Sequence, residues 1–503
     1  MSNAWLILAF GLYFLKLIGI AIVGARRTRD MSDYVLAGRR LGSFTAALSA
    51  GSSTTSAWTM LALPALAFSS GVVEVWVPAA AAVGIWLSWT VLAKRLRRYT
   101  IEANDVLTIP EFFEVRFGDT TGVLRTLTSV ITIFFVVFYV SSGLVGGSKL
   151  LETVFGIEAT AGVLLTLLAI ASYTVIGGFL AVSRTDVSQA LLMLLSLLVI
   201  VIALTVATER PFSGIGGTSP GFLSPFTDAA GSPITVTFAL SAAGWAFGAF
   251  GAQRILQRFM ALEREDLVPR SRNISTLWIS TVYALAILVG LLAYPALAEA
   301  GALADVVDAE RVYFVVSEIF FHPIVTGLLL TAVIAAVMST ADSQLLLASA
   351  VATDDLPFLK RVAYGLTANR RVWLGRLLLL VIGGISAVIA VLQPESIFDL
   401  VAYAWGGMGA AFGPVTILAL FWRRFNFWGA AASILVGTVV ATLWEFLDGG
   451  PSGMWDIQPA TPGFLIALAT AVVVTLLTPK PSSEVVRLFD RVNGTADGGR
   501  VRR

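Results

Sequence analysis

The chain of 503 residues contains no cysteine, a single histidine and few charged side chains. The absence of cysteine excludes disulfides, thiol nucleophiles and thiolate metal sites, and one histidine cannot build a His-rich zinc or di-iron centre. Only 13% of the residues are charged, against about 25% in a soluble globular protein. With 57% hydrophobic residues and a mean hydropathy of +0.84, the chain is predicted to be an integral membrane protein surrounded by lipid.

Apolar runs of about 20 residues, the length that crosses a bilayer as a helix, recur along the whole chain. They predict an all-α membrane protein with about thirteen transmembrane helices. No segment between them is long enough to form a soluble domain of its own. The predicted spans are residues 4–24, 43–68, 73–93, 123–148, 161–182, 187–208, 233–260, 276–298, 318–350, 373–392, 397–421, 427–446 and 460–478.

Lysine and arginine residues are concentrated in the loops that follow odd-numbered spans. Because positive residues stay on the cytoplasmic side of short loops, we expect an outer N-terminus, a cytoplasmic C-terminus and a location in the cell (inner) membrane. Residues 1–42 then form a first span with a basic cytoplasmic loop, 209–232 a Gly/Pro/Ser-rich extracellular loop, and 480–503 a cytoplasmic tail. The clusters include Arg26, Arg27, Arg29, Arg39, Arg40, Lys94, Arg95, Arg97, Arg98, Lys360, Arg361, Arg500, Arg502 and Arg503, with Arg210 and Arg311 as the main exceptions in outer loops.

The most informative stretch is residues 332–355, an apolar run that carries several polar side chains at membrane depth. A carboxylate near the middle of a spanning helix costs roughly 2.5–3.5 kcal/mol on insertion scales, and it is retained where it faces a cavity, a partner or an ion. Ser339 and Ser343 are four residues apart and share a helix face, and Thr340 and Asp342 lie beside them. Hydroxyl and carboxylate oxygens suit a small hard cation, so this helix predicts a cation site inside a transporter.

Two spans contain clusters that weaken a helix near its middle. Span 2 carries Gly51 followed by five serine and threonine residues, and span 7 carries Gly244, Gly248 and Gly251. The two spans are five apart, as expected for a secondary transporter built from two inverted five-helix repeats with broken helices at corresponding positions. The alternative interpretation is that small residues only allow neighbouring helices to approach closely.

Five motifs, in order, resemble the sodium:solute symporter family and, within it, the sodium/proline symporter branch. They are DYVLAGRRLGSFTAALSAGSS (33–53), GGFLAVSRTD (177–186), GWAFGAFGAQRILQRFMA (244–261), AAVMSTADSQLL (335–346) and VAYAWGGMGAAFGPV (401–415). The resemblance covers nearly all of residues 5–480. It implies a LeuT-type fold, with one repeat in 43–208 (spans 2–6), the second in 233–421 (spans 7–11), and two further spans in 422–479.

The resemblance also implies a sodium site between spans 2 and 9. Carried over by position, its ligands are the backbone carbonyls of Ser52, Thr55 and Ala336 and the hydroxyls of Ser339 and Thr340. Asp186 matches a family acidic residue near the ion path, where it would act together with Asp342 and Ser343; its alternative role is a helix N-cap, because SRTD precedes an apolar run. The implied solute-binding positions are Thr54, Trp58, Tyr139, Trp245, Ala249 and Gln253.

The chain departs from the proline branch at two places. That branch usually has an aspartate where this chain has Thr54, and Asp342 is a candidate to supply the missing charge. In span 7 the usual tyrosine-phenylalanine-glycine-glutamine-proline-histidine is here the stretch 249–254, AFGAQR, which enlarges and polarises the edge of the pocket. Proline is therefore the first expectation for the solute, with another small amino acid, an osmolyte or a small carboxylate as the alternative.

The leading hypothesis is a sodium-coupled symporter that carries a small solute into the cell by alternating access. Proton coupling is the open alternative, because Asp186 and Asp342 could relay protons. A solute sensor is disfavoured by a tail too short for an output domain, and an enzyme by the absence of a nucleophile–base pair or a cofactor motif. We expect Na⁺ as the coupling ion, no organic cofactor, no nucleic acid and no obligate protein partner.

Overall fold

The computed structural model describes residues 3–26, 31–103, 105–209, 211, 219–392, 396–447 and 449–494. These residues are largely helical and contain no β-strand, only isolated bridges between Leu41 and Leu262 and between Thr227 and Pro233. The predicted all-α class is therefore confirmed. Several basic residues that entered the orientation argument lie outside the described residues, namely Arg27, Arg29, Arg210, Arg500, Arg502 and Arg503.

The first half of the chain, up to the long loop that begins after residue 207, contains nine α-helices and one π-helical turn, η2, among the described residues. They are α1 (Asn3–Ala25), α2 (Met31–Leu36), α3 (Ser43–Ser52), η2 (Trp58–Ala62), α4 (Leu63–Ser70), α5 (Trp76–Val91), α6 (Ala93–Glu102), α7 (Ile109–Phe117), α8 (Val123–Phe155) and α9 (Ala159–Ala207).

The second half begins at α10 and ends with a short helix in the predicted tail. Its elements are α10 (Val236–Gly251), α11 (Gln253–Ala261), α12 (Val268–Glu299), the turn η7 (Ala309–Arg311), α13 (Val312–Phe320), α14 (Pro323–Asp355), α15 (Pro357–Tyr364), α16 (Ala368–Leu392), α17 (Ile397–Phe421), α18 (Phe427–Trp444), α19 (Ala460–Leu477) and α20 (Ser483–Asn493).

Among the described residues, 10 helices are long and apolar enough to cross a membrane, and the segments Trp58–Ser70 and Val236–Gly251 are shorter apolar helices. The predicted spans 161–182 and 187–208 lie together in α9, a helix of 49 residues that bends at Gly178. Gly178 has φ 64°, a conformation that glycine adopts without the steric penalty of a side chain. The count of thirteen spans and their division into repeats remain predictions.

The ninth predicted span differs from the structure at its start. The prediction begins at residue 318, whereas α14 begins at Pro323, after the separate helix α13. Proline favours the first turn of a helix because its missing N–H would have no partner there. The polar stretch of 332–355 therefore occupies the middle and the end of one uninterrupted helix.

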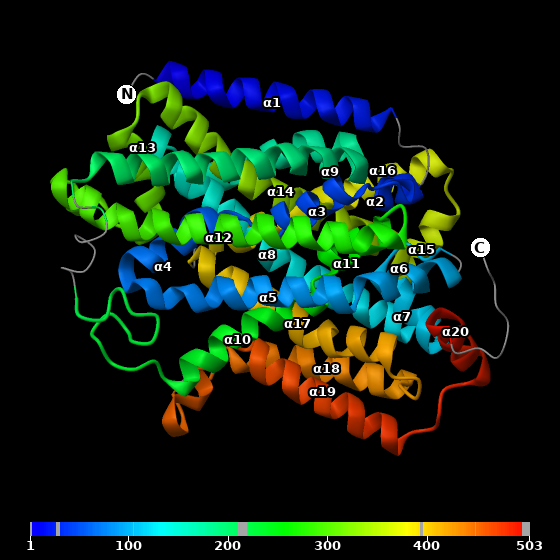
Figure 1. The fold of residues 1–503 in the computed structure, drawn as a ribbon. Helices are drawn as coiled ribbons and strands as arrows, with labels where there is room; N and C mark the ends of the chain where they lie inside the picture. Colours follow the sequence, from blue (N-terminus) through cyan, green and yellow to red (C-terminus); the bar gives the residue numbers. More distant parts are fainter. Residues whose placement is uncertain are drawn as a thin grey trace.

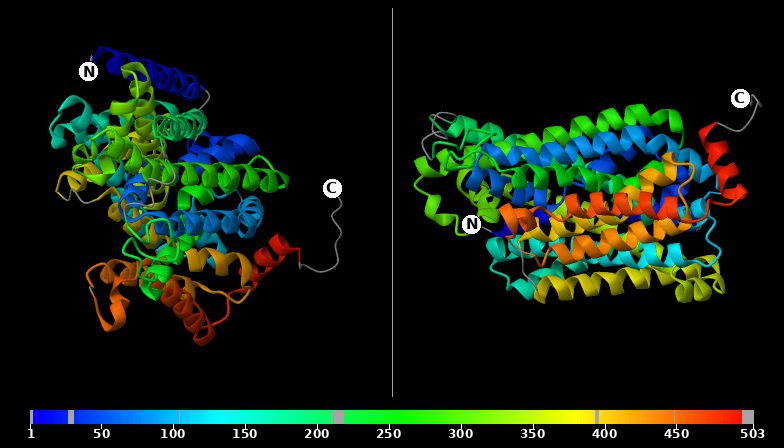
Figure 2. Two further views of the ribbon diagram at one scale, coloured as in Figure 1. Left: turned by 60° about the vertical axis from the view of Figure 1, so that its left-hand side comes forward. Right: turned by 90° about the horizontal axis from the view of Figure 1, so that it is seen from below.

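The long helices run side by side, with α1 along one edge of the molecule and α18 and α19 along the opposite edge (Figure 1). Helix α13 lies at one end of the bundle, and α6, α7, α15 and α20 lie at the other, as the view from below also shows (Figure 2). Helix α14 passes through the interior: every residue from Leu329 to Asp355 except Ile334 is buried. Its polar side chains therefore face protein rather than lipid.

Candidate functional site

The first of the two predicted helix breaks lies between α3 and η2. Helix α3 ends at Ser52, and helical structure resumes at Trp58. In the break, Thr54 Oγ1 donates to Ala50 O at 2.7 Å and Thr55 Oγ1 donates to Gly51 O at 3.2 Å. Such short hydroxyl side chains compete for backbone carbonyls and weaken the helix locally. The predicted interruption of span 2 is confirmed.

The second break separates α10 from α11 at Ala252, which has the extended value ψ 96°. Gly251 precedes it at a close crossing of two helices: a Cβ added there would lie 2.0 Å from Met408 O on α17. The predicted interruption of span 7 is therefore confirmed as well. The alternative interpretation, that small residues allow helices to approach closely, also holds at this position. Gly251 lies both next to the break and at the crossing of α10 with α17.

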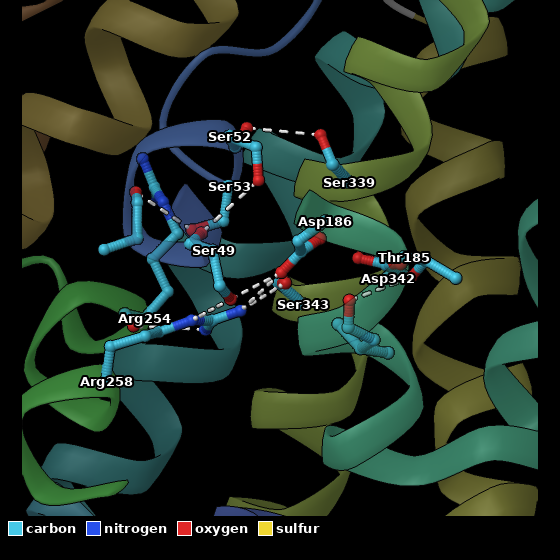
Figure 3. A network of polar contacts seen from close by, with 12 residues as sticks. Ser49, Ser52, Ser53, Thr185, Asp186, Arg254, Arg258, Ser339, Asp342 and Ser343 are labelled. Carbon is cyan, nitrogen blue, oxygen red and sulfur yellow. Dashed lines mark hydrogen bonds and ion pairs between the residues drawn. The ribbon is translucent and has the colours of Figure 1, made fainter. Parts of the chain in front are cut away.

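Four of the five predicted sodium ligands come together where the end of α3 meets the middle of α14. Ser339 Oγ lies 3.2 Å from Ser52 O and 3.1 Å from Ala336 O, and Thr340 Oγ1 lies 3.5 Å from Ser52 O. Figure 3 shows Ser52 and Ser339 facing each other across this junction. The fifth residue is Thr55. Its hydroxyl donates to Gly51 O and Ser52 O, and these bonds hold Thr55 against the last turn of α3.

The predicted ion-path residues lie in a second polar cluster, farther along the same helices (Figure 3). Asp186 on α9 is fully buried, accepts a hydrogen bond from Ser49 Oγ at 2.6 Å, and forms an ion pair with Arg258 Nη2 at 3.3 Å. The same Nη2 donates to Ser343 Oγ at 2.7 Å. Asp186 is therefore held inside the helix bundle, in the interior of α9, and the alternative N-cap role is wrong.

Asp342 is buried one turn from Ser339, but its hydrogen bond goes to another helix. Its Oδ2 accepts from Tyr173 Oη on α9 at 2.5 Å. Its Oδ1, like Asp186 Oδ1, has no hydrogen-bond partner in the part of the chain that the structure describes. A buried carboxylate oxygen without a donor is costly, so these two oxygens are where the site could receive a proton or a cation.

The predicted aromatic solute residues are buried, and two of them are in contact. The rings of Trp58 and Trp245 are 5.0 Å apart, and Trp58 also lies 5.3 Å from Tyr283. The third, Tyr139 on α8, lies over the guanidinium of Arg254 at 4.2 Å. Trp405 connects the two groups: its ring centre lies 5.1 Å from the Arg254 guanidinium, and its Nε1 donates to Trp245 O at 2.9 Å.

The remaining predicted solute positions line the two breaks. Thr54 O accepts a hydrogen bond from Trp58 Nε1 at 3.1 Å, and Ala249 is fully buried near the end of α10. Gln253 Nε2 donates to Thr132 Oγ1 on α8 at 2.6 Å, whereas its Oε1 has no partner among the described residues.

The sequence interpretation missed Arg258, Ser49 and Tyr173. Arg258 carried a usable signal, because QRILQRFMA places two arginines in a segment predicted to lie in the membrane. The roles of Ser49 and Tyr173 had no local signal. Both lie in ordinary helical sequence, and their partners are 137 and 169 residues away.

Comparison with known proteins gives the family and the fold. A model of the sodium:solute symporter family matches residues 34–437. The chain is 36% identical over 490 residues to a sodium/proline symporter of Haemophilus influenzae, covering 96% of this chain and 97% of that protein. It is 35% identical over 492 residues to the osmoregulated proline transporter OpuE of Bacillus subtilis, with coverage of 96% and 97%.

A solved structure of a Na⁺-coupled sialic acid symporter, in a substrate-bound outward-open state, has a TM-score of 0.78 at 18% identity. It covers 95% of this chain and 99% of that chain. This likeness confirms the predicted LeuT-type membrane fold. The family model that matches residues 34–437 and the 36% identity to the Haemophilus influenzae symporter establish that the chain belongs to the sodium:solute symporter family.

Proposed function

We propose that this protein couples the entry of Na⁺ to the uptake of L-proline across the cell membrane. Family membership makes it a multi-pass membrane symporter, and relatives named as proline transporters match it over nearly their full length. The stretch 249–254 differs from the usual sequence of the proline branch. Another small amino acid, an osmolyte or a small carboxylate is therefore the alternative solute.

The observation that carries the proposal is the meeting of oxygens from α3 and α14. The distances from Ser52 O to Ser339 Oγ and Thr340 Oγ1 and from Ser339 Oγ to Ala336 O span 3.1–3.5 Å. Oxygen ligands at about 2.3–2.6 Å from a hard cation, as for Ca²⁺, lie roughly 3.3–3.7 Å apart when they subtend a right angle at the ion. The two distances between the helices, 3.2 Å and 3.5 Å from Ser52 O, therefore suit one small cation that bridges α3 and α14.

The ligands come from helices that can separate. Ser52 ends the broken helix α3, while Ala336, Ser339 and Thr340 belong to the continuous helix α14. A cation that bridges α3 and α14 binds more tightly when the two helices are in contact than when they are apart. Cation binding therefore shifts the population toward the state with the helices in contact, and the size of the shift is set by this difference in affinity. Because Trp58 follows in the same break, ion binding also fixes one wall of the proposed solute pocket.

Sodium is the coupling ion of the proposal, and protons are the alternative. Carbonyl and hydroxyl ligands need no titratable group to bind Na⁺, whereas proton coupling would depend on Asp186 and Asp342. Both carboxyl groups are buried and each has one oxygen without a partner among the described residues. In the transport cycle, Asp186 and Asp342 are proposed to line the path of the ion after it leaves the sodium site at Ser339.

The proposed orientation places the end with α6, α7, α15 and α20 in the cytoplasm. That end carries the basic residues of α6 and α15, such as Lys94, Arg95, Lys360 and Arg361. Positive residues favour the cytoplasmic side, so the α13 end would face outward and the N-terminus would lie outside. The proposed location is the cell (inner) membrane.

Uptake of radiolabelled L-proline into proteoliposomes that contain the full chain tests the proposal. Accumulation is expected under an inward sodium gradient, with none when potassium replaces sodium. Protein-free liposomes serve as the control. No proline uptake under a sodium or a proton gradient would refute the solute assignment, and uptake driven only by protons would refute the coupling ion.

A further inference from the structure

Arg254, the second residue of α11, is a fully buried cation without a hydrogen-bond acceptor. Its side chain has 0% exposure, and none of its three guanidinium nitrogens has a partner in the part of the chain that the structure describes. Buried charges are normally paired because the loss of hydration must be offset. Arg254 therefore has its donors available for a group that is not part of the described chain.

Two other buried arginines do have hydrogen-bond partners, so the lack of partners at Arg254 is not a general feature of buried arginines in this protein. Arg258, one turn later on α11, contacts Ser49, Asp186 and Ser343. Arg116, also fully buried, donates to Ala419 O at 2.6 Å through Nε.

The guanidinium of Arg254 lies among aromatic side chains. Its guanidinium carbon lies 4.2 Å from the centre of the Tyr139 ring and 5.1 Å from that of Trp405. The hydroxyls of Tyr139 and Tyr283 both lack hydrogen-bond partners among the described residues. A guanidinium stacked on aromatic rings keeps its N–H fork free to bind a planar anion such as a carboxylate in two places.

The anion-binding groups adjoin the proposed solute pocket. The Tyr283 ring is 5.3 Å from Trp58, and Trp58 is 5.0 Å from Trp245. On the other side, Trp405 Nε1 donates to Trp245 O at 2.9 Å. A small solute could therefore place an apolar ring against the tryptophans and an anionic group on Arg254.

We propose that Arg254 binds the carboxylate of the transported solute, with the hydroxyl of Tyr139 donating to the same group. The inference rests on the proposed function, because it places the solute in the pocket of Trp58 and Trp245. It adds a selection rule: the protein carries solutes with a carboxylate and rejects their neutral amides. Arg254 is then the specificity-determining residue of the pocket.

Competition with labelled L-proline uptake tests this rule, with unlabelled L-proline and L-prolinamide as the competitors. The wild type should prefer proline to prolinamide by at least tenfold. Arg254→Gln should raise the KM for proline by at least tenfold and remove the preference, while Arg254→Lys should retain part of it. Arg376→Gln is the matched control, because Arg376 also lies over an aromatic ring, at 4.6 Å from Trp373, but on the partly exposed helix α16. An unchanged preference in Arg254→Gln would overturn the inference.

A binding assay separates this inference from the solute assignment. Thermal unfolding of the purified full chain is followed in sodium sulfate with added L-proline, L-prolinamide, succinate or chloride. If proline is not transported, the assignment of proline fails, but a carboxylate that stabilises the wild type and not Arg254→Gln still supports the Arg254 site. Stabilisation by chloride alone, or equal stabilisation of wild type and Arg254→Gln by carboxylates, refutes it. Arg254→Lys replaces Arg254→Gln if the latter does not purify as a single species.

Discussion

Removal of one hydroxyl from α14 should weaken sodium coupling by a defined amount. In Ser339→Ala the cation loses one of its oxygen contacts, while Ser52 O, Ala336 O and Thr340 Oγ1 remain. A hydrogen-bond-like contact to a charged group contributes about 1.5–3 kcal/mol. At a factor of ten for about 1.4 kcal/mol, the sodium concentration for half-maximal uptake should rise roughly 10- to 150-fold.

Sodium-dependent proline uptake into proteoliposomes, measured at constant ionic strength with choline as the replacement cation, gives this concentration. Thr340→Ala should shift it in the same direction, and Thr340→Ser should restore it because the hydroxyl is kept. Ser349→Ala is the matched control: Ser349 is also buried on α14, and its Oγ donates within its own helix, to Leu346 O at 2.9 Å. Unchanged sodium dependence in both Ser339→Ala and Thr340→Ala, or an equal shift in Ser349→Ala, would refute the site.

Three further predictions concern other parts of the molecule. Asp342→Asn should reduce proline accumulation against a gradient more than it reduces the amount of folded protein, because the amide oxygen can still accept from Tyr173; normal accumulation would make Asp342 a structural group. Trp245→Ala should raise the KM for proline about tenfold or more, since a well-packed aromatic contributes several kcal/mol, with the sodium affinity measured without solute unchanged; a shift in both would contradict separate sites. Burial opposes ionisation of Asp308, but hydrogen bonds from Lys149 and the Glu310 backbone outweigh it, and the pKa of Asp308 lies below its ordinary value. The contribution of the Asp308 carboxylate to stability is therefore complete above the ordinary pKa of about 4 and is lost as the pH falls through the lowered pKa. The difference in unfolding temperature between wild type and Asp308→Asn should be constant from pH 8 to 5 and shrink below pH 4. A constant difference at every pH would contradict this prediction.

The sequence predicted the features that stand out against an apolar background. Hydroxyl residues within the runs 51–56 and 339–343 are conspicuous in a membrane protein, and they indicated the broken helix and a polar site on α14. The meeting of Ser52 with Ser339 was implied by the family resemblance and not by the residues alone. The bend of α9 was less accessible, because a glycine inside an apolar run indicates a loop and a bent helix equally well. The prediction placed the boundary between two spans at residues 183–186, whereas the two helical segments of α9 meet at a kink at Gly178.

Partner choice could not be predicted from local sequence. Asp342 was a candidate to supply charge to the sodium site, yet its hydrogen bond is to Tyr173 on α9. Asp186 was assigned to the ion path without a counter-ion, and the structure pairs it with Arg258, which is 72 residues away. Such pairings depend on how helices cross, and the spacing of residues within one helix carries no information about that.

Helix α11 connects the two charges that a symporter must bring together. Arg254 and Arg258 are one turn apart, and Arg258 Nη1 donates to Arg254 O at 3.1 Å. Arg258 also reaches Ser343 on α14, one turn beyond the proposed sodium ligand Ser339. A carboxylate on Arg254 and a sodium ion beside Ser339 add opposite charges to one buried network, so each lowers the cost of binding the other. Because such coupling is reciprocal, Arg254→Gln should weaken the effect of proline on sodium affinity even though Arg254 does not contact the ion.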